Sequence, residues 1–261
     1  MVRVGNFFFH YRNGLFPLVY LLLFPKSLPL LASYKLAALV GLFVAATGQT
    51  VRAVTIGLDY IRRGGKNHQV FANRLVQGGI FAHCRNPLYV GNYLVIVGVG
   101  FASNSILFLT VAIPFFALAY WAITAAEENY LRTKFGAEYD EYCARVNRFV
   151  PRFVGLSRTL GGMEFNWRRL ISAEYGSTFI WTAAMTLVVL KNVWLAGEYR
   201  FGNHLVQALW VVLGLLTLAY AFARYLKKTG KLSEPARSSR TALLRHVREV
   251  YERPGHRGTR E

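Results

Sequence analysis

The chain reads Gly79-Ile-Phe-Ala-His83-Cys-Arg85-Asn86-Pro87-Leu-Tyr89-Val-Gly91-Asn92 where a polar segment meets a hydrophobic one. The hydrophobic segment begins at Leu88 and continues, with one short polar break, to Ala126. Charged, hydrogen-bonding and conformationally restricted residues therefore stand directly against apolar sequence. A site built here lies at a membrane surface, where one reactant can arrive from water and the other from lipid. This placement indicates an enzyme rather than an inert membrane protein.

The composition is that of a membrane protein with several spans. Of the 261 residues, 54% are hydrophobic and only 17% are charged, whereas about a quarter of the residues of a soluble domain are charged. The charged residues cluster between long apolar runs, as they do between transmembrane helices. We therefore predict an all-α fold, a polytopic transmembrane helical bundle of about six spans: 14–31, 36–58, 88–103, 105–125, 175–196 and 203–223.

The net charge of +18 is distributed unevenly along the chain. Of the 31 Lys and Arg residues, 26 fall in the segments 1–13, 59–87, 126–174 and 224–261, which share one side of the membrane in the six-span arrangement. The positive-inside rule makes that side the cytosol and places both termini there; a bacterial inner membrane is the expected location. Basic segments beside a membrane attract anionic lipid headgroups. We therefore expect the lipid bilayer, and not nucleic acid, as the partner of this charge.

Four segments follow from this organisation. We expect two N-terminal spans at 1–58, a catalytic core with connector helices at 59–153, a connector with two further spans at 154–226, and a basic tail at 227–261. Cys84 and Cys143 both fall on the predicted cytosolic side, so no disulfide is expected between them. No spacing of His, Cys or Asp in the sequence is typical of a metal site.

The third and fourth spans are expected to form a helical hairpin. Pro87 suits the first turn of a helix, because its missing N–H has no intrahelical partner there, and it pushes Asn86 away from helical geometry. A sharp bend is therefore predicted at Arg85–Asn86. Residues 103–105 (Ser-Asn-Ser) form a tight reversal, which returns the chain to the side of the bend. Close helix approach along the third span is expected at Gly91, Gly98 and Gly100.

A mixed helical segment follows the fourth span. Gly136 is expected to end one helix and begin another. Apolar and aromatic residues recur at helical spacing on both sides of it and make one stripe, which we expect to lie at the membrane interface or to close over the bend. The stripe consists of Leu131, Phe135, Tyr139, Tyr142 and Val146.

Three groups of side chains converge when the hairpin closes. They are the bend with His83, Arg85, Asn86 and Tyr89, the acidic pair Glu127–Glu128, and the segment Arg148-Phe149-Val-Pro151. They offer carboxylates for an ammonium group or a ribose, a guanidinium for a carboxylate, and aromatic faces for a flat base or a sulfonium. These are the requirements of S-adenosylmethionine. Because adjacent helical residues point about 100° apart, one acid of the pair is expected to contact the ligand and the other to pair with an arginine.

The same residues carry a resemblance to a known family. The pattern Gly79-x-Phe81-x-His83-x-Arg85-Asn86-Pro87-x-Tyr89-x-Gly91 is followed by Glu127-Glu128-x-x-Leu131-x-x-x-Phe135-Gly136-x-x-Tyr139-x-x-Tyr142-x-x-x-Val146-x-Arg148-Phe149-x-Pro151. Together they resemble the isoprenylcysteine carboxyl methyltransferase and phospholipid methyltransferase superfamily, over about residues 75–153. Either half alone is a weak signal, whereas the two at this separation are specific.

The resemblance implies an integral membrane methyltransferase that binds S-adenosylmethionine from the cytosolic side. It implies cofactor contacts by the bend, namely Arg85, Asn86, Pro87 and Tyr89, and by the pair Glu127 and Glu128. We add Phe81, His83, Gly91, Tyr139 and Phe149 as candidate cofactor-binding residues. Two positions depart from the common pattern: Phe81 stands where the family often has Tyr, and Asn86 stands where His is commoner.

The methyl acceptor is expected to be lipophilic and to enter from the membrane. A prenylcysteine-type carboxylate is already ionised at neutral pH and needs no general base, whereas an amine must lose a proton and no dedicated base is apparent. This favours a carboxylate slightly over a lipid amine. Candidate catalytic residues are Arg85, Arg148 and Arg52. For Arg52, snorkelling of an intramembrane charge to the surface is an equal alternative.

Two other functions fit the sequence. A reductase of the related sterol type would place a reduced nicotinamide cofactor in a similar pocket, and it predicts a phosphate-binding basic cluster near the bend. A non-enzymatic membrane scaffold would use the basic tail to recruit lipid or a partner, and it predicts no cofactor affinity. The sequence does not indicate an oligomeric state.

Overall fold

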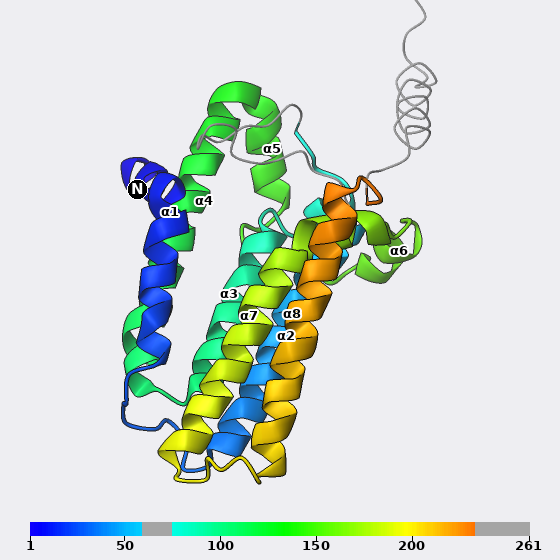
Figure 1. Cartoon of the computed structure of the whole chain (residues 1–261). Helices are drawn as coiled ribbons and strands as arrows, with labels where there is room; N and C mark the ends of the chain where they lie inside the picture. Colours follow the sequence, from blue (N-terminus) through cyan, green and yellow to red (C-terminus); the bar gives the residue numbers. More distant parts are fainter. Residues whose placement is uncertain (59–74, 233–261) are drawn as a thin grey trace, which may run out of the picture.

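The computed structural model describes residues 1–58 and 75–232, and within these ranges all regular structure is helical. The predicted all-α bundle is confirmed. Six long or medium helices run along the bundle (Figure 1): α1 Val2–Tyr20, α2 Tyr34–Leu58, α3 Pro87–Ser103, α4 Ile113–Phe135, α7 Trp167–Leu195 and α8 His204–Lys228. Shorter elements are the 3₁₀ turns Leu21–Leu23 and Gly79–Ala82, the π-helical turn Phe108–Ala112 that leads into α4, α5 Ala137–Arg145 and α6 Leu156–Gly161.

Helices α2, α3 and α7 form the centre of the bundle, and α2 and α3 make its closest contact. Glycines create that contact. A Cβ atom at Gly48 would lie 2.6 Å from the carbonyl oxygen of Gly91 and 2.8 Å from the amide nitrogen of Val95. Gly41 and Gly98 meet in the same way further along the two helices. Backbones approach this closely in membranes only where small residues face each other.

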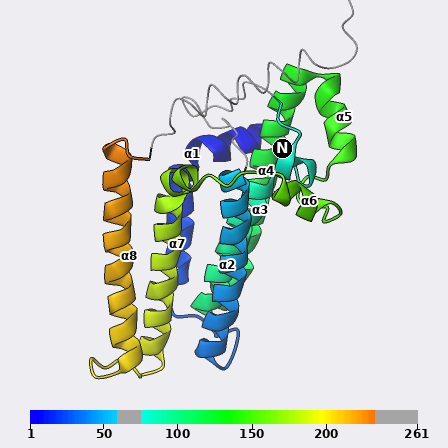
Figure 2. The ribbon, with the colours of Figure 1, turned by 90° about the vertical axis from the view of Figure 1, so that its right-hand side faces the viewer.

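Helix α4 leaves α3 and packs along α1 instead (Figures 1 and 2). A Cβ atom at Gly5 would collide with the backbone of Ala122, and Phe8 and Phe9 of α1 are buried against Ile123 and its neighbours. The predicted reversal between the third and fourth spans is confirmed, because Asn104 adopts the left-handed conformation with φ 52°. The hairpin therefore opens from that reversal towards the end of the bundle where α3 begins and α4 ends, called the site end below.

The described chain is an integral membrane protein by the length and composition of its helices. Four helices are long and apolar enough to cross a membrane: α2, the continuous helix Phe108–Phe135, α7 and α8. Helix α3 is apolar but shorter. The expected number of six spans is not confirmed, because neither α1 nor α3 meets these criteria.

The first predicted span, 14–31, is wrong in its position. Helix α1 begins at Val2 and ends at Tyr20, and residues 24–33 are not helical. Pro25 and Pro29 explain the early end, because proline lacks an N–H and disfavours helical geometry in the residue before it. At the other end, the polar N-terminal residues continue the helix because Gly5, Phe8 and Phe9 give it a face that packs on α4.

Other predicted boundaries shift by smaller amounts. The fourth span continues ten residues beyond its predicted end, to Phe135, and α7 begins at Trp167, eight residues before the predicted fifth span 175–196. Gly136 separates α4 from α5 with φ 53°, as predicted. Residues 59–74 of the predicted catalytic core and residues 233–261 of the predicted basic tail lie outside the described residues.

The end of the bundle opposite the site is closed by hydrogen bonds from α7. Lys191 donates to the carbonyl oxygens of Leu23 and Ser103, at 2.8 and 2.9 Å, and Asn192 donates to that of Ala102 at 2.8 Å. These carbonyl groups stand at the ends of helical segments, where they have no intrahelical donor. One lysine thus fixes the turn after α1, the end of α3 and α7 together.

Replacement of Gly48 by valine should destabilise the bundle, because the new side chain meets the backbone of α3. We expect Gly48→Val to lower the free energy of unfolding by about 1–3 kcal/mol and to lower the Tm in detergent. The matched control is Gly214→Val on α8, where a Cβ atom meets nothing within 4 Å. Scanning fluorimetry of both variants measures the difference, and equal melting temperatures would contradict the role assigned to the α2–α3 contact.

Candidate functional site

The predicted bend stands at the start of α3. Gly79 has φ 59°, the turn Gly79–Ala82 follows it, and Pro87 begins α3 after Asn86, whose φ and ψ of −130° and 53° are not helical. The bend at Arg85–Asn86 is thereby confirmed. Because the proline fixes the first turn of the helix, the polar side chains before it are held at the site end of the bundle.

Backbone hydrogen bonds tie the bend to the segment after α5. The amide of Arg85 donates to the carbonyl of Asn147 at 3.0 Å, and the amide of Arg152 donates to the carbonyl of His83 at 2.9 Å. The side-chain amide of Asn86 donates to the carbonyl of Arg148 at 3.2 Å. The two halves of the sequence pattern, separated by about 60 residues, are therefore adjacent in space.

An ion-pair network forms where these segments meet α4. Arg148 donates to the Glu128 carboxylate, from Nε to Oε1 at 3.0 Å and from Nη2 to Oε2 at 2.5 Å. Nη2 of Arg85 lies 3.1 Å from the same Oε1. The Glu128 side chain is only 6% exposed, and that of Arg85 is 11% exposed. Two guanidinium groups thus share one buried carboxylate, and the network carries a net positive charge.

The network has an unused donor. Nε of Arg85 is buried and has no hydrogen-bond partner among the described residues. A buried guanidinium N–H without an acceptor is costly, and together with the positive charge of the network it fits an anionic group of a ligand. The carboxylate of S-adenosylmethionine is such a group, so the environment of Arg85 fits this part of the cofactor.

Glu127 points to a different partner from its neighbour. Its carboxylate accepts from the Tyr89 hydroxyl at 2.6 Å, and the Tyr89 ring lies 5.4 Å from that of Tyr120. The expectation that one acid of the pair binds an arginine agrees with the contacts of Glu128. That one acid of the pair contacts a ligand remains a prediction.

Aromatic rings border the network on two sides. Tyr139 and Tyr142 are buried with Leu131 in the cluster between α4 and α5, and the Tyr142 hydroxyl donates to the carbonyl of Phe81 at 2.7 Å. The predicted stripe therefore closes over the bend. Burial raises the pKa of the Tyr139 phenol, and the charge of Glu128 raises it further, so this group is neutral at physiological pH.

Trp121 belongs to the site and was missed in the sequence. The Arg148 guanidinium lies 5.0 Å from its ring centroid, and the Phe149 ring is 5.8 Å away. Trp121 precedes Glu128 by seven residues, which places both on one face of α4. That spacing is the signal that could have identified it.

Several predicted residues hold the site together through protein contacts. Both ring nitrogens of His83 have partners, the Arg152 carbonyl at 2.7 Å and the Thr159 hydroxyl at 2.9 Å, so this side chain fastens α6 to the bend. Gly91 faces α2, where a Cβ atom would lie 2.6 Å from Cγ of Arg52. Burial raises the pKa of the Cys84 thiol, which disfavours its use as a nucleophile.

Arg52 stands apart from the Glu128 network and binds a second carboxylate. Its Nε and Nη2 donate to Glu174 of α7 at 2.8 and 2.5 Å, and Gln49 also donates to Glu174 at 3.3 Å. Glu174 was given no role from the sequence. The intramembrane charge of Arg52 is therefore compensated inside the bundle, a third arrangement beside the two expected ones.

Sequence comparisons with known proteins identify relatives of part of this chain. The phospholipid methyltransferase family model matches residues 36–138. The nickel-cobalt-cadmium resistance protein NccN of Alcaligenes xylosoxydans xylosoxydans is 34% identical over 121 residues, which cover 45% of this chain and 54% of that protein. The cobalt-zinc-cadmium resistance protein CzcN of Cupriavidus metallidurans is 40% identical over 80 residues, which cover 31% and 37%.

The chain spans about half the length, or less, of these curated relatives. No solved structure matches it. Among the described residues, no group of three or more His, Cys, Asp and Glu side chains could hold a metal ion. The matched range contains most of α2, the bend and the Glu127–Glu128 pair, whereas Arg148 lies beyond it. Residues 36–138 therefore resemble the phospholipid methyltransferase family, which belongs to the isoprenylcysteine carboxyl methyltransferase-like membrane superfamily.

Proposed function

We propose that this membrane protein transfers a methyl group from S-adenosylmethionine to a lipophilic acceptor. The observation that carries the proposal is the buried Glu128 carboxylate shared by Arg85 and Arg148, with Nε of Arg85 left without an acceptor. The resemblance to this family supports methyl transfer in a membrane. S-adenosylmethionine supplies a methyl group on a sulfonium, and the protein's task is then mainly to position the reactants.

Different side chains of the site would bind different parts of the proposed cofactor. Arg85 would bind the amino-acid carboxylate through its unused Nε–H. Glu127, held by Tyr89, offers a carboxylate for the ammonium group or the ribose hydroxyls. The rings of Trp121 and Phe149 offer flat apolar faces for the adenine. Pro87 and Asn86 fix the backbone from which Arg85 projects.

The acceptor is proposed to be a prenylcysteine-type carboxylate or a lipid headgroup that enters from the membrane. Neither Tyr139 nor Cys84 is a suitable base, since burial raises the pKa of both groups. A carboxylate acceptor, which is ionised already, agrees best with this environment. Arg148 is the proposed orienting cation, because its side chain is 30% exposed, whereas that of Arg52 is 13% exposed.

We propose that the site end faces the cytosol of a bacterial inner membrane. Helix α1 begins and α8 ends at this end of the bundle (Figure 1), and α8 ends with Lys227 and Lys228. The positive-inside rule favours such an orientation. The soluble cofactor would then reach the site from the cytosol, and anionic headgroups of the bilayer would face the basic segments.

Replacement of both acids should abolish cofactor binding. We expect Glu127→Gln/Glu128→Gln to lose measurable affinity for S-adenosylmethionine and S-adenosylhomocysteine in calorimetry of the detergent-purified protein. The variant lacks the Glu127 carboxylate that would bind the ligand and the Glu128 carboxylate that holds two arginines. The matched control, Glu141→Gln/Glu164→Gln, removes the same charge from exposed positions and should bind normally. Unaltered affinity in the first variant would refute the site; binding of reduced dinucleotide alone would favour the reductase.

The planar set of N–H donors on Arg85 should contribute more to cofactor affinity than its charge does. Arg85→Lys keeps the charge but loses the planar set of donors, so we expect S-adenosylhomocysteine affinity to fall about tenfold. The control is Arg132→Lys, which alters an exposed arginine that binds Asp140 through Nε at 2.7 Å and should change affinity little. Equal affinities of the two variants would contradict the role of Arg85.

Methyl transfer itself is tested with radiolabelled S-adenosylmethionine. Purified full-length protein is incubated with a farnesylated cysteine analogue or with extracted membrane lipids, and label in the organic phase is counted. We expect transfer to at least one acceptor, and loss of transfer in Glu127→Gln/Glu128→Gln. Label in the cysteine analogue would identify a carboxylate acceptor, and label in lipid alone would redirect the acceptor to a headgroup.

A further inference from the structure

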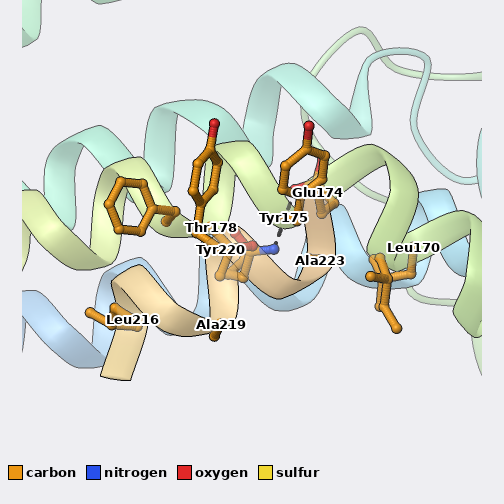
Figure 3. Close-up of a pocket in the computed structure, with 11 residues that line it drawn as sticks. Leu170, Glu174, Tyr175, Thr178, Leu216, Ala219, Tyr220 and Ala223 are labelled. Carbon is orange, nitrogen blue, oxygen red and sulfur yellow. Dashed lines mark hydrogen bonds between the residues drawn. The ribbon is translucent and has the colours of Figure 1, made fainter. Parts of the chain in front are cut away.

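A groove lies between α7 and α8, two helices that follow the range matched by the phospholipid methyltransferase family (Figure 3). Its volume is about 290 Å³. Apolar side chains dominate its lining, including Leu170, Phe179 and Leu216. The wall also contains Tyr175 and Tyr220, whose hydroxyls point to the same side in Figure 3. An apolar channel of this kind between two membrane helices can accept an acyl chain.

The inner wall of the groove carries no uncompensated charge. Glu174 lines it, and its carboxylate is held by Arg52 at 2.8 and 2.5 Å and by Gln49 at 3.3 Å, the bond drawn in Figure 3. Trp181 in turn donates to Gln49 at 2.9 Å. A ligand in the groove therefore meets a paired carboxylate, which repels an anion much less than a free one.

The site end of the groove is basic. Lys227 donates to the carbonyl of Ser172 at 2.7 Å and lies 5.1 Å from the Tyr175 ring centroid. Arg224 donates to the Tyr220 hydroxyl at 3.0 Å. Both cations are exposed, and each contacts a tyrosine that lines the groove. The basic mouth and the apolar channel are thus parts of one continuous surface.

The mouth lies at the depth of a membrane interface. Trp167 begins α7 and is 66% exposed, and the contact between Lys227 and Ser172 places the end of α8 beside the second turn of α7. Exposed tryptophan and basic side chains at one level are typical of the headgroup region. Basic pockets between transmembrane helices at this depth bind anionic headgroups.

We propose that the α7–α8 groove is a binding site for one anionic phospholipid. The phosphate would lie between Arg224 and Lys227, and one acyl chain would follow the groove past Phe179 and Leu216. Charge complementarity selects this occupant: a zwitterionic lipid brings its own cation to a mouth that is already positive, whereas an anionic lipid compensates it. The site is separate from the proposed cofactor site and does not depend on methyl transfer.

The first test compares lipids with identical acyl chains. Native mass spectrometry of the full-length protein in detergent measures binding of phosphatidylglycerol and phosphatidylcholine. We expect the wild type to prefer phosphatidylglycerol, and Arg224→Gln/Lys227→Gln to reduce that preference about tenfold or more. The control Arg3→Gln/Arg158→Gln removes the same charge from exposed positions on α1 and α6 and should keep the preference. An equal loss in the control, or no loss in the first variant, would refute a defined site.

The second test fills the channel. Ala219 lines the groove (Figure 3), so Ala219→Trp should reduce phosphatidylglycerol binding severalfold by excluding the acyl chain. Ala221→Trp, on an exposed position of the same helix outside the lining, is the matched control. Melting temperatures establish that both variants fold. Equal lipid binding by two folded variants would overturn the proposed path of the chain.

Discussion

Two guanidinium groups from distant parts of the chain share the carboxylate of Glu128, and the architecture of the site end depends on this sharing. Arg85 comes from the bend before α3, Arg148 comes from the segment after α5, and Glu128 stands on α4 between them in sequence. Charges this deeply buried are tolerated only when they are paired and hydrogen bonded. Loss of the carboxylate would leave both cations uncompensated, so the acid holds three segments in one arrangement.

The membrane helices determine where those segments can meet. Gly48 and Gly91 bring α2 and α3 into backbone contact, while α4 turns away to pack along α1. The hairpin therefore opens towards the site end, and α5 folds back from α4 so that Tyr142 reaches the carbonyl of Phe81. The divergence of α3 and α4 follows from the small residues that bring α3 against α2 and, at Gly5, α1 against α4. The same helices that cross the bilayer thus create the polar site at its surface.

Charged side chains inside the bundle form ion pairs at two depths. Arg52 binds Glu174 between α2 and α7, and Glu128 binds two arginines nearer the surface. Glu174 of this pair also lines the α7–α8 groove, while Cγ of Arg52 adjoins Gly91 on α3. This pair therefore joins α2 to α7.

Local signals in the sequence determined the helical class, the bend at Arg85–Asn86, the reversal at Asn104 and the break at Gly136, because proline, asparagine and glycine act on their own backbone and immediate neighbours. They also brought the bend, the acidic pair and Arg148 into one hypothesis. Only the tertiary structure decided which carboxylate each arginine binds, that Trp121 adjoins Arg148, and that α1 begins at Val2 and packs on α4. Those features depend on contacts between residues far apart in the chain, and burial, which makes such pairing obligatory, cannot be assigned before the helices are packed.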